Sequence, residues 1–453
     1  MAEYDYMVEV QNPHAEAPLQ IAVTSNVTLE DINHNVAVNA TRGGIRWFAC
    51  RDAFEERAII VGGGPSLADN TAAIREMAED HVVIAVNGAS KFLSERGIEV
   101  DFQFIMDARP ENASLIDPDA HNYTLASQCH PALFNLVPEA RTEMVHLNSP
   151  GIEDHFPTPR RKAGGYTLIG GAASVGNSAL CLAHAMGHRD LHVFGFDTSV
   201  DGEKRHAYPQ DMNNGEALIQ KRLGNRAYWM SYAMAVQYQL FFTIEEELKK
   251  LGTKLTVYGD GILPERWRMK QKADAMTEAE KYELVWSHSE YGIVSPAERI
   301  AHVIDGWLPP KADVLDLGCG VGRAAVKLTE MGHNVHLIDF VENSRDQSAM
   351  SLPFTKADLS KPLPISAEHG YCCDVMEHIP PGDVSSVIEN IANACSKGVL
   401  WRIEFDLDGH GPALIGTPLH LSVHDHIWWA EELAHHFDVV EYRGNGIFIT
   451  EHT

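Results

Sequence analysis

The chain has 453 residues, of which 45% are hydrophobic and 22% are charged, and its formal net charge is -27. This length is more than a single hydrophobic core usually supports, so we expect at least two domains. A chain this acidic is unsuited to a nucleic-acid backbone, because binding phosphates requires a basic surface. We therefore expect no nucleic-acid partner.

The seven cysteines are scattered and form no C-x-x-C pair, which is typical of free thiols in a reducing compartment. Residues 1–10 carry acids and lack the apolar core of a secretory signal. No apolar run approaches the length that a membrane-spanning helix needs. We expect a cytoplasmic protein without a membrane span, and the sequence leaves its oligomeric state open.

Residues 1–57 give few structural signals, and we expect an N-terminal extension that packs on the domain after it. The apolar stretches 21–23 and 36–38 have the character of short strands. Thr28 can begin a helix, because acidic residues come after it at the spacing of a helix start.

Residues 58–263 alternate short apolar segments with helix-forming ones, which predicts a parallel sheet with polar groups at the carboxyl ends of its strands. The expected strands are 58–61, 81–86, 102–106, 191–194 and 254–258, and the expected helices are 71–78, 178–186 and 228–251. This arrangement suits a nucleotide-binding domain.

A glycine-rich turn, Gly62-Gly63-Gly64-Pro65-Ser66-Leu67, follows the first of these strands. Exposed backbone N–H groups at such a turn, together with a helix N-terminus, favour an anion such as phosphate. A purely structural turn capped by Ser66 explains the same letters, and the turn alone does not decide between the two interpretations.

Four segments resemble the family that joins motility-accessory-factor glycosyltransferases to archaeal 6-hydroxymethylpterin diphosphokinase. They are Gly63-Gly64-Pro65-Ser66-Leu67, Asn87-Gly88, Asp107-Ala108-Arg109-Pro110-Glu111-Asn112 and Gly195-Phe196-Asp197. The run from Ser174 to Asp197 is also similar to bacterial sialyltransferases that use CMP-sugars. These relatives transfer either a sugar or a diphosphate, so the resemblance implies a bound nucleotide or nucleotide-sugar and leaves the reaction open.

The resemblance implies that Gly63, Gly64, Ser66 and Asn87 line the phosphate and sugar. Asp107 and Asp197 are then candidates to hold a ribose, a metal-bound phosphate or the acceptor. His206, on a polar loop, is the best candidate for a general base, with an ordinary surface histidine as the alternative. Magnesium stays open as a cofactor, because the D-x-D letters of residues 117–119 follow no clear strand and indicate a turn.

Residues 264–281 are charged and helix-forming, which predicts a helical linker before a second domain at 282–453. In that domain a buried strand, Val314-Leu315-Asp316-Leu317, leads into Gly318-Cys319-Gly320-Val321-Gly322. The next expected strand, 334–338, ends in Asp339, at the spacing where a ribose-binding acid belongs.

The run 316–322 resembles the cofactor loop of class I S-adenosylmethionine (SAM) methyltransferases. The resemblance continues through Asp339, Lys356-Ala357-Asp358 and Cys373-Asp374-Val375-Met376-Glu377-His378-Ile379-Pro380. It implies that Asp316, Gly318 and Gly320 belong to the SAM-binding loop and that Asp339 binds the ribose hydroxyls. It also implies that Asp358 faces the adenine amino group, with an acid on a solvated loop as the alternative.

Histidines supply the candidates for the methyl-acceptor site. His378 is either a general base beside the substrate or a structural residue. His420, His424 and His426 precede Trp428-Trp429 after the expected strand 398–405, and their spacing is not that of a defined zinc site. We expect His420 to line the acceptor pocket beside Glu377 and His378, without a bound metal.

Together these features predict an α/β protein of two Rossmann-like domains with mostly parallel sheets, joined by a helical linker. The resemblances imply a bifunctional transferase, in which a SAM-dependent methyltransferase acting on a small molecule or glycan follows a nucleotide-dependent glycosyl- or diphosphotransferase. The alternative is a methyltransferase whose N-terminal domain is an inactive nucleotide- or partner-binding module.

Overall fold

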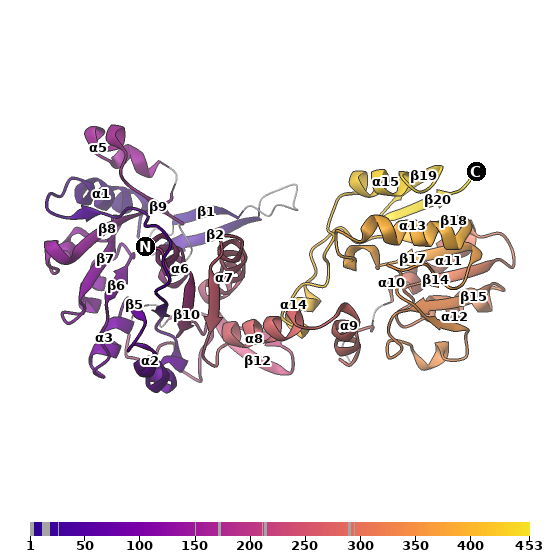
Figure 1. The fold of residues 1–453 in the computed structure, drawn as a ribbon, viewed down its shortest axis with the longest axis horizontal. Helices are drawn as coiled ribbons and strands as arrows, with labels where there is room; N and C mark the ends of the chain where they lie inside the picture. Colours follow the sequence, from indigo (N-terminus) through magenta and orange to yellow (C-terminus); the bar gives the residue numbers. More distant parts are fainter. Residues whose placement is uncertain are drawn as a thin grey trace. The chain divides into compact units, whose positions relative to one another are not determined.

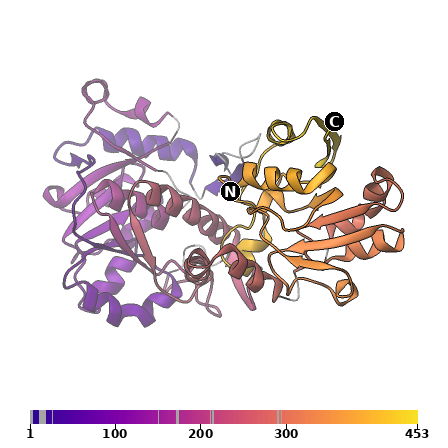
Figure 2. The same ribbon diagram turned by 45° about the vertical axis from the view of Figure 1, so that its right-hand side comes forward.

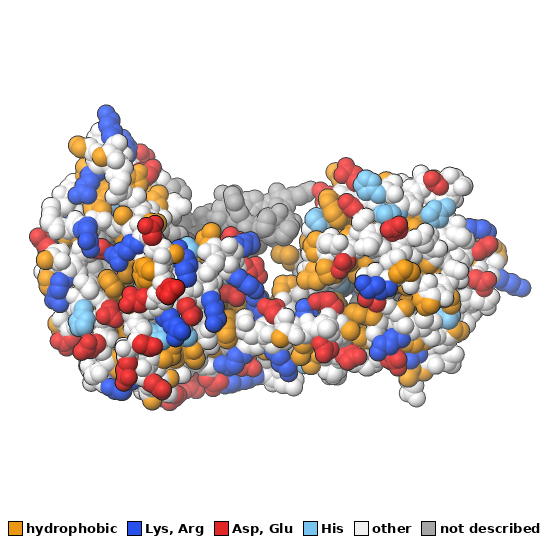
Figure 3. Space-filling model, in the orientation of Figure 1, with side chains coloured by type: hydrophobic (Ala, Val, Ile, Leu, Met, Phe, Trp, Pro, Cys, Tyr) orange, Lys and Arg blue, Asp and Glu red, His pale blue; other side chains and the backbone are white. Residues whose placement is uncertain are grey.

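The computed structural model of the chain divides into two compact units, Met1–Arg268 and Met269–Thr453 (Figure 1). On the face that Figure 3 shows, basic side chains are scattered among acidic ones over each unit. The structure describes residues 4–10, 19–25, 27–149, 151–170, 174–210, 212, 215–288, 291–293 and 295–453.

The N-terminal segment begins with an antiparallel hairpin of β1 (Tyr4–Val10) and β2 (Leu19–Ser25), which confirms the strand expected at 21–23. The helix α1 (Leu29–Ala40) comes next. Its predicted start is also confirmed, because the Thr28 side chain accepts a hydrogen bond from the backbone N–H of Asp31 at 3.0 Å.

The strand expected at 36–38 is wrong, because these residues lie within α1. Asn35 and Asn39 face the same side of this helix and are buried there. The Asn39 amide donates to the carbonyls of Ser127 and Cys129, at 2.9 and 2.7 Å. The apolar residues 36–38 therefore belong to a helix that long-range hydrogen bonds hold in place. A short stretch of sequence does not reveal such hydrogen bonds.

The first unit is built on a parallel sheet with the strand order β13-β10-β4-β5-β6-β7-β8-β3, and β9 pairs with β8. After β3, which lies beside β8, the chain forms β4, adds β5 to β8 in turn on one side and then returns to the other side of β4 at β10. The two strands flank the point where the strand order reverses, and ligands bind at such points in open α/β sheets. The strands are β3 (Arg46–Trp47), β4 (Ala58–Val61), β5 (Val82–Val86), β6 (Phe102–Ile105), β7 (Asn122–Ala126), β8 (Thr142–Leu147), β9 (Leu168–Ile169), β10 (Asp190–Phe194) and β13 (Lys254–Val257).

A separate antiparallel hairpin, β11 (Leu218–Leu223) and β12 (Arg226–Ser231), corrects the single helix expected at 228–251. Tyr228 and Met230 are buried while Trp229 between them is exposed, which is the alternation of a strand. The helix α7 (Tyr232–Lys250) starts only after this hairpin. The remaining helical segments of this unit are η1 (Pro65–Asn70), α2 (Thr71–Met77), α3 (Ala89–Ser94), η2 (Pro110–Leu115), α4 (Pro131–Phe134), η3 (Glu139–Arg141), η4 (Ile152–His155), α5 (Thr158–Ala163) and α6 (Val175–Ala185), with α8 (Ile262–Asp274) crossing the unit boundary.

The second unit contains a seven-stranded sheet with the order β16-β15-β14-β17-β18-β20-β19, in which β20 runs antiparallel to its two neighbours. The strand order reverses between β14 and β17, and such points are where open α/β sheets bind ligands. The strands are β14 (Asp313–Leu317), β15 (Asn334–Asp339), β16 (Phe354–Lys356), β17 (Ala367–Cys373), β18 (Cys395–Arg402), β19 (Val439–Gly444) and β20 (Ile447–Glu451). The helical segments are α9 (Glu278–Trp286), α10 (Pro296–Arg299), α11 (Ala301–Trp307), α12 (Arg323–Glu330), η5 (Gln347–Ala349), η6 (Met376–His378), α13 (Val384–Ala394), α14 (His410–Leu414) and α15 (His426–Ala434).

Both faces of this second sheet are covered by helices (Figures 1 and 2). Leu315 and Leu317 of β14 join one hydrophobic cluster, with α13 and Trp429, whereas Val314 joins another, with α11 and α12. Successive side chains of a strand point to opposite faces, so this division results from the pleat. A near-continuous apolar strand such as 314–317 is what a doubly covered sheet requires.

Two further sequence expectations find structural counterparts. All seven cysteines are free thiols. Within the described ranges, no helix combines the length and apolar character needed to cross a bilayer.

The helix α13 provides a test of the packing in the second unit. Ile388 is fully buried in the cluster that contains Trp401 and Trp429, whereas the next residue, Glu389, is exposed. Ile388→Ala should lower the free energy of unfolding of this unit by about 2–5 kcal/mol, through lost burial and the cavity left behind. Denaturant unfolding of the full chain measures this, with Glu389→Ala as the control that should change stability by less than about 0.5 kcal/mol. Equal effects of the two substitutions would contradict this packing of α13.

Candidate functional site

The glycine loop after β14 folds back over the end of β15. Gly318, Gly320 and Gly322 have φ values of +78°, +49° and +72°, a region that side chains with a Cβ rarely adopt. The backbone N–H groups of Gly318 and Cys319 both donate to the carbonyl of Ile338, at 2.9 and 3.0 Å. The loop is thus held tightly against the neighbouring strand.

Asp339 ends β15 and fastens the same loop. Its Oδ2 accepts a hydrogen bond from the N–H of Gly320 at 2.9 Å, and its Oδ1 accepts one from the N–H of Val341 at 3.1 Å. The residue is only 7% exposed, and burial raises the pKa of its carboxyl group. The backbone of Phe340 also acts on this carboxylate, which has about four acceptor positions, so capacity remains for a further donor.

Aromatic side chains lie against the glycine loop. The indole of Trp286, at the end of α9, would be 3.3 Å from a Cβ placed on Gly320. Tyr291 packs edge-on against Trp286, with 4.7 Å between the ring centroids. Burial raises the pKa of the Tyr291 hydroxyl, and the negative charges of Asp408, Glu377 and Asp339 raise it further. The Tyr291 hydroxyl is therefore close enough to Asp339, at the end of β15, and to Glu377, after β17, for their charges to act on it.

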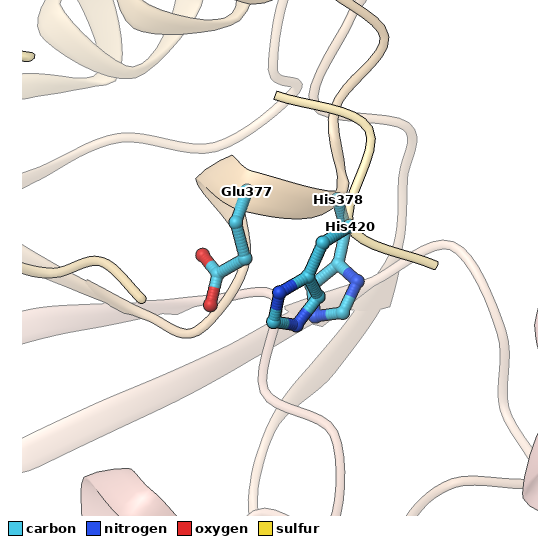
Figure 4. Close-up of side chains that lie close together, drawn as sticks. All are labelled: Glu377, His378 and His420. Carbon is cyan, nitrogen blue, oxygen red and sulfur yellow. The ribbon is translucent and has the colours of Figure 1, made fainter. Parts of the chain in front are cut away.

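Glu377 and His378 lie on η6, which directly follows β17, and His420 lies on the loop between α14 and α15. One ligand atom from each of these three side chains lies within 4.8 Å of the other two. Figure 4 shows the carboxylate and the two imidazole rings extending to the same side of η6. The structure thus brings together the residues that the sequence predicted to share a pocket.

The loop that carries His420 is fixed to η6 by backbone hydrogen bonds. The N–H groups of Leu421 and Ser422 both donate to the carbonyl of Glu377, at 2.7 and 2.9 Å. The Ser422 hydroxyl donates to the carbonyl of Ile379 at 2.7 Å. Because Ser422 is fully buried, this attachment is shielded from water.

Both histidines of this group are oriented by backbone carbonyls. Nδ1 of His378 lies 3.1 Å from the carbonyl of Leu419, and Nδ1 of His420 lies 2.7 Å from the carbonyl of Asp406. A carbonyl oxygen only accepts, so each Nδ1 carries the proton and each Nε2 keeps a lone pair. Burial lowers the pKa of His378 to about 4, so its ring is neutral at pH 7.

Glu377 is a buried acid with incomplete hydrogen bonding. Its Oε1 accepts from the N–H of Glu404 at 3.3 Å, whereas its Oε2 has no hydrogen-bond partner in the described part of the chain. Burial raises the pKa of this carboxyl group to about 8. The charged neighbour that acts on it, Glu404, is also acidic and raises the pKa further.

Asp358 stands apart from this group. It is exposed, and its Oδ1 accepts a hydrogen bond from the N–H of Ser360 at 2.8 Å. Its contact with an adenine stays a prediction.

In the first unit, Asp197 fastens the glycine turn. Its two carboxylate oxygens accept from the N–H and the hydroxyl of Ser66, at 2.7 and 2.5 Å. A Cβ on Gly64 would lie 2.5 Å from this carboxylate and 2.8 Å from the carbonyl of Gly195. Asp197 is buried, and this burial raises the pKa of its carboxyl group. Gly64, Ser66 and Asp197 therefore form one packed structural unit.

Gly63, the residue before Gly64 in this turn, is covered by the loop that carries His206 and Tyr208. A Cβ on Gly63 would overlap the Tyr208 hydroxyl and lie 3.3 Å from the His206 ring, and a Cβ on Gly88 would also meet Tyr208. Burial lowers the pKa of His206 and raises that of Tyr208. His206 is thus placed beside the glycine turn, as part of a partly buried cover.

Asn87 and Asp107 lie at the carboxyl ends of β5 and β6. Asn87 has a φ of +49°, and its side-chain oxygen is buried without a hydrogen-bond partner among the described residues. Asp107 forms an ion pair with Arg109 at 2.5 Å and accepts three further hydrogen bonds from that residue. Asp117 is a turn residue, as expected, whose carboxylate accepts from Ser90 at 2.6 Å and is buried.

Comparison with known proteins finds one family match within each unit. Residues 31–203 match the family model of 6-hydroxymethylpterin diphosphokinase MptE-like proteins, and residues 314–398 match the model of a methyltransferase domain. The chain combines an MptE-like domain with a methyltransferase domain. The resemblances to these two families are thereby confirmed.

Individual relatives cover only parts of the chain. The 23S rRNA (uracil(1939)-C(5))-methyltransferase RlmD of Pseudomonas putida is 28% identical over 134 residues, which are 26% of this chain and 29% of that protein. The MAf glycosyltransferase of Magnetospirillum magneticum AMB-1 has a TM-score of 0.38 and 15% identity, over 67% of this chain and 50% of that one. Magnesium protoporphyrin IX methyltransferase from Synechocystis PCC 6803 has a TM-score of 0.29 and 17% identity, over 42% of this chain and 99% of that one. The chain thus spans less than a third of the curated relative that it matches.

Two features of these domains were not predicted from the sequence. The first is Tyr208, which fills the space beside Gly63 and Gly88 in the MptE-like domain. The second is Ser422, which attaches the His420 loop to η6 in the methyltransferase domain. Tyr208 is two residues from His206 and Ser422 is two residues from His420, so their positions were a signal, but neither residue type by itself indicates such a contact.

The buried acid of β14 gives the methyltransferase domain a pH-dependent stability. Burial raises the pKa of Asp316 from 3.8 to about 7, so the folded state prefers the neutral acid. This stabilising contribution is complete below the pKa of the unfolded chain and is lost as the pH rises through about 7. Asp316→Asn, which mimics the neutral acid, should therefore gain stability relative to the natural chain as the pH rises from about 4 to 8.

Thermal unfolding of both proteins across this pH range measures the effect. A stability difference that does not change with pH would show that Asp316 is ionised in the folded domain.

Proposed function

We propose that residues 282–453 form a SAM-dependent methyltransferase that acts on a small molecule or glycan. The observation that carries this proposal is the joint hydrogen bonding of Asp339 and the glycine loop. The carboxylate is fixed by Gly320 and Val341, yet it keeps acceptor capacity for a further donor such as a ribose hydroxyl.

The surrounding residues fit the same cofactor. The positive-φ glycines leave the loop without side chains that would block a close approach, and the Trp286 ring lies beside Gly320. SAM supplies an electrophilic methyl group, so the protein's task is to place the acceptor atom in line with it. Gly318, Gly320, Asp316 and Asp339 would hold the cofactor in this assignment, with Asp358 toward the adenine.

The acceptor is proposed to bind beside Glu377, His378 and His420. Glu377 and His378 closely follow β17, the strand next to β14 at the point where the strand order reverses, and His420 lies beside them. The lone pairs on the two Nε2 atoms can accept hydrogen bonds from an acceptor group. Although one relative modifies ribosomal RNA, the net charge of -27 favours a small molecule or glycan over a nucleic acid.

Loss of the Asp339 carboxylate should weaken SAM binding. Asp339→Ala removes hydrogen bonds from a charged group, which are worth about 1.5–3 kcal/mol, so the dissociation constant should rise by about 10- to 150-fold. Isothermal titration of the full chain with SAM measures this, with Glu330→Ala, an exposed acid at the end of α12, as the control. Unchanged affinity in Asp339→Ala would overturn the assignment of this residue.

For residues 58–263 we propose binding of a nucleotide or nucleotide-sugar at the edge formed by the ends of β4, β5 and β6. The unpartnered oxygen of Asn87, beside the glycine turn, supports this proposal. A glycosyl- or diphosphotransferase would use such a site, with His206 as the base. Magnesium belongs to the same proposal, with the half-buried Asp107 as its candidate ligand.

The alternative, an inactive binding module, is favoured by a specific observation. Asp107 is paired with Arg109, and Asp197 contacts Ser66 and is closely surrounded by glycines, so both carboxylates already have polar partners in this conformation. Tyr208 fills the space next to Gly63 and Gly88. A transferase would have to move both the loop of Tyr208 and the Arg109 side chain.

The transferase and the nucleotide-binding module both require that the domain binds a nucleotide. Nucleotide titration tests this requirement. We expect at least one of CTP, CMP, ATP and GTP to bind the full chain, and Asn87→Gly to weaken that binding by about 2- to 12-fold through one lost hydrogen bond. Glycine is chosen because it keeps the positive φ without strain. Asn122, at the start of β7 on the opposite edge of the sheet, supplies the control Asn122→Gly. If none of the four nucleotides binds, the nucleotide-binding proposal is wrong.

A further inference from the structure

The Glu377, His378 and His420 group has the composition of a metal site. Two imidazole nitrogens and one carboxylate oxygen are a donor set that zinc and other first-row transition metals bind, with further positions open to a ligand. Their ligand atoms all lie within 4.8 Å of one another. In a tetrahedral zinc site, with bonds of about 2.0–2.2 Å, the ligand atoms are about 3.3–3.5 Å apart. A small side-chain adjustment would close the difference.

The hydrogen bonds around the two histidines are those that metal ligands need. A ligating histidine generally donates its second ring N–H to a carbonyl or carboxylate, which fixes the ring and leaves the other nitrogen for the metal. His378 donates through Nδ1 to Leu419, and His420 donates through Nδ1 to Asp406. In both rings it is therefore Nε2 that remains available.

The carboxylate supplies an independent observation. Oε2 of Glu377 is buried without a hydrogen-bond partner in the described residues, although buried polar atoms are nearly always paired. The charged residue that acts on this group is another acid, Glu404. A cation at this oxygen would supply the missing partner and offset the cost of burying the charge.

The loop geometry keeps the three donors together. The N–H groups of Leu421 and Ser422 hold the His420 loop against the carbonyl of Glu377. The other two histidines of the sequence cluster pack against aromatic rings. His424 stacks on Trp428 at 3.7 Å between ring centroids, and His426 stacks on Tyr442 at 4.8 Å.

We propose that Glu377, His378 and His420 bind a divalent transition-metal ion, for which zinc is the best fit, and that its open position receives a hydroxyl oxygen of the methyl acceptor. The sequence spacing of His420, His424 and His426 led to the expectation of a metal-free pocket. In the structure His420 lies beside Glu377 and His378, and these three side chains form a set of metal-binding donors. The proposed metal site therefore replaces that expectation.

The second half of this inference rests on the proposed methyltransferase function and narrows its acceptor to a hydroxyl compound. A divalent ion lowers the pKa of a bound hydroxyl and so makes its oxygen a better nucleophile. The oxygen forms a bond to the methyl carbon, the bond between that carbon and the sulfonium sulfur breaks, and the hydroxyl proton passes to solvent. The products are a methyl ether and neutral S-adenosylhomocysteine.

Metal titration tests the site directly. The full chain, freed of metal with a chelator, should bind one equivalent of Zn²⁺ in isothermal titration, and Co²⁺ in place of Zn²⁺ should give the visible absorption of a nitrogen- and oxygen-ligated ion. His420→Ala and Glu377→Gln should each weaken Zn²⁺ binding by at least 100-fold, since even outer-shell substitutions cost about 10- to 100-fold. His426→Ala, a histidine of the same segment outside the group, is the matched control and should bind as the natural chain does.

A SAM titration of every variant shows whether the domain is folded. Absence of saturable Zn²⁺ binding in the natural chain, or equal binding in His420→Ala, would overturn the metal site. If SAM binds and Zn²⁺ does not, the methyltransferase proposal stands and the metal site falls. If Zn²⁺ binds and SAM does not, the metal site stands and the methyltransferase proposal falls.

Discussion

Hydrogen bonds from a glycine turn to a buried carboxylate at or just after the end of a neighbouring strand organise both units of this protein. In the MptE-like domain, Asp197 accepts from the backbone and the hydroxyl of Ser66. In the methyltransferase domain, Asp339 accepts from the backbone of Gly320. Each contact joins the ends of two adjacent parallel strands and so sets the shape of the edge where ligands bind in such sheets.

The two carboxylates differ in how closely glycines pack around them. Both oxygens of Asp197 contact Ser66, and the glycines packed around this carboxylate leave no space for a side chain. The oxygens of Asp339 contact two different backbone groups and retain further acceptor capacity. In both units the carboxylate thus fastens a glycine turn, and the close packing of Gly64, Gly259 and Gly261 around Asp197 is what distinguishes the first unit.

Local sequence signals were sufficient for most of the fold. The strands around residues 58–61, 314–317 and 334–338 were predictable because doubly covered parallel strands are short, almost entirely apolar and bounded by turn residues. The hairpin that ends at Ser231 was missed, because Tyr228 and Met230 alternate over too few residues to be separated from the helix after them. The stretch 36–38 was misassigned, because its helix depends on hydrogen bonds from Asn39 to a distant loop.

The candidate sites show the same difference between local sequence signals and long-range contacts. Gly320, Asp339 and Glu377 belong to motifs whose members lie close in sequence or at a fixed spacing, so the sequence was able to indicate them. The placement of His420 beside His378, and of Tyr208 over Gly63, depends on how distant loops close on the sheet. This placement also bears on the chemistry of His420, because the side chains beside it in space, and not its neighbours in the sequence, determine whether it can belong to a metal site.

Burial of acids in the methyltransferase domain links its stability to its ligands. Asp316, Asp339 and Glu377 are all buried near the strand ends, and burial raises the pKa of each. A folded domain that buries acids without a cation beside them is less stable than one in which the same acids meet positive charge. The sulfonium of SAM and the divalent ion proposed above are both positively charged, so either would stabilise the folded domain on binding. The acids whose burial is costly are thus the groups through which binding can restore stability.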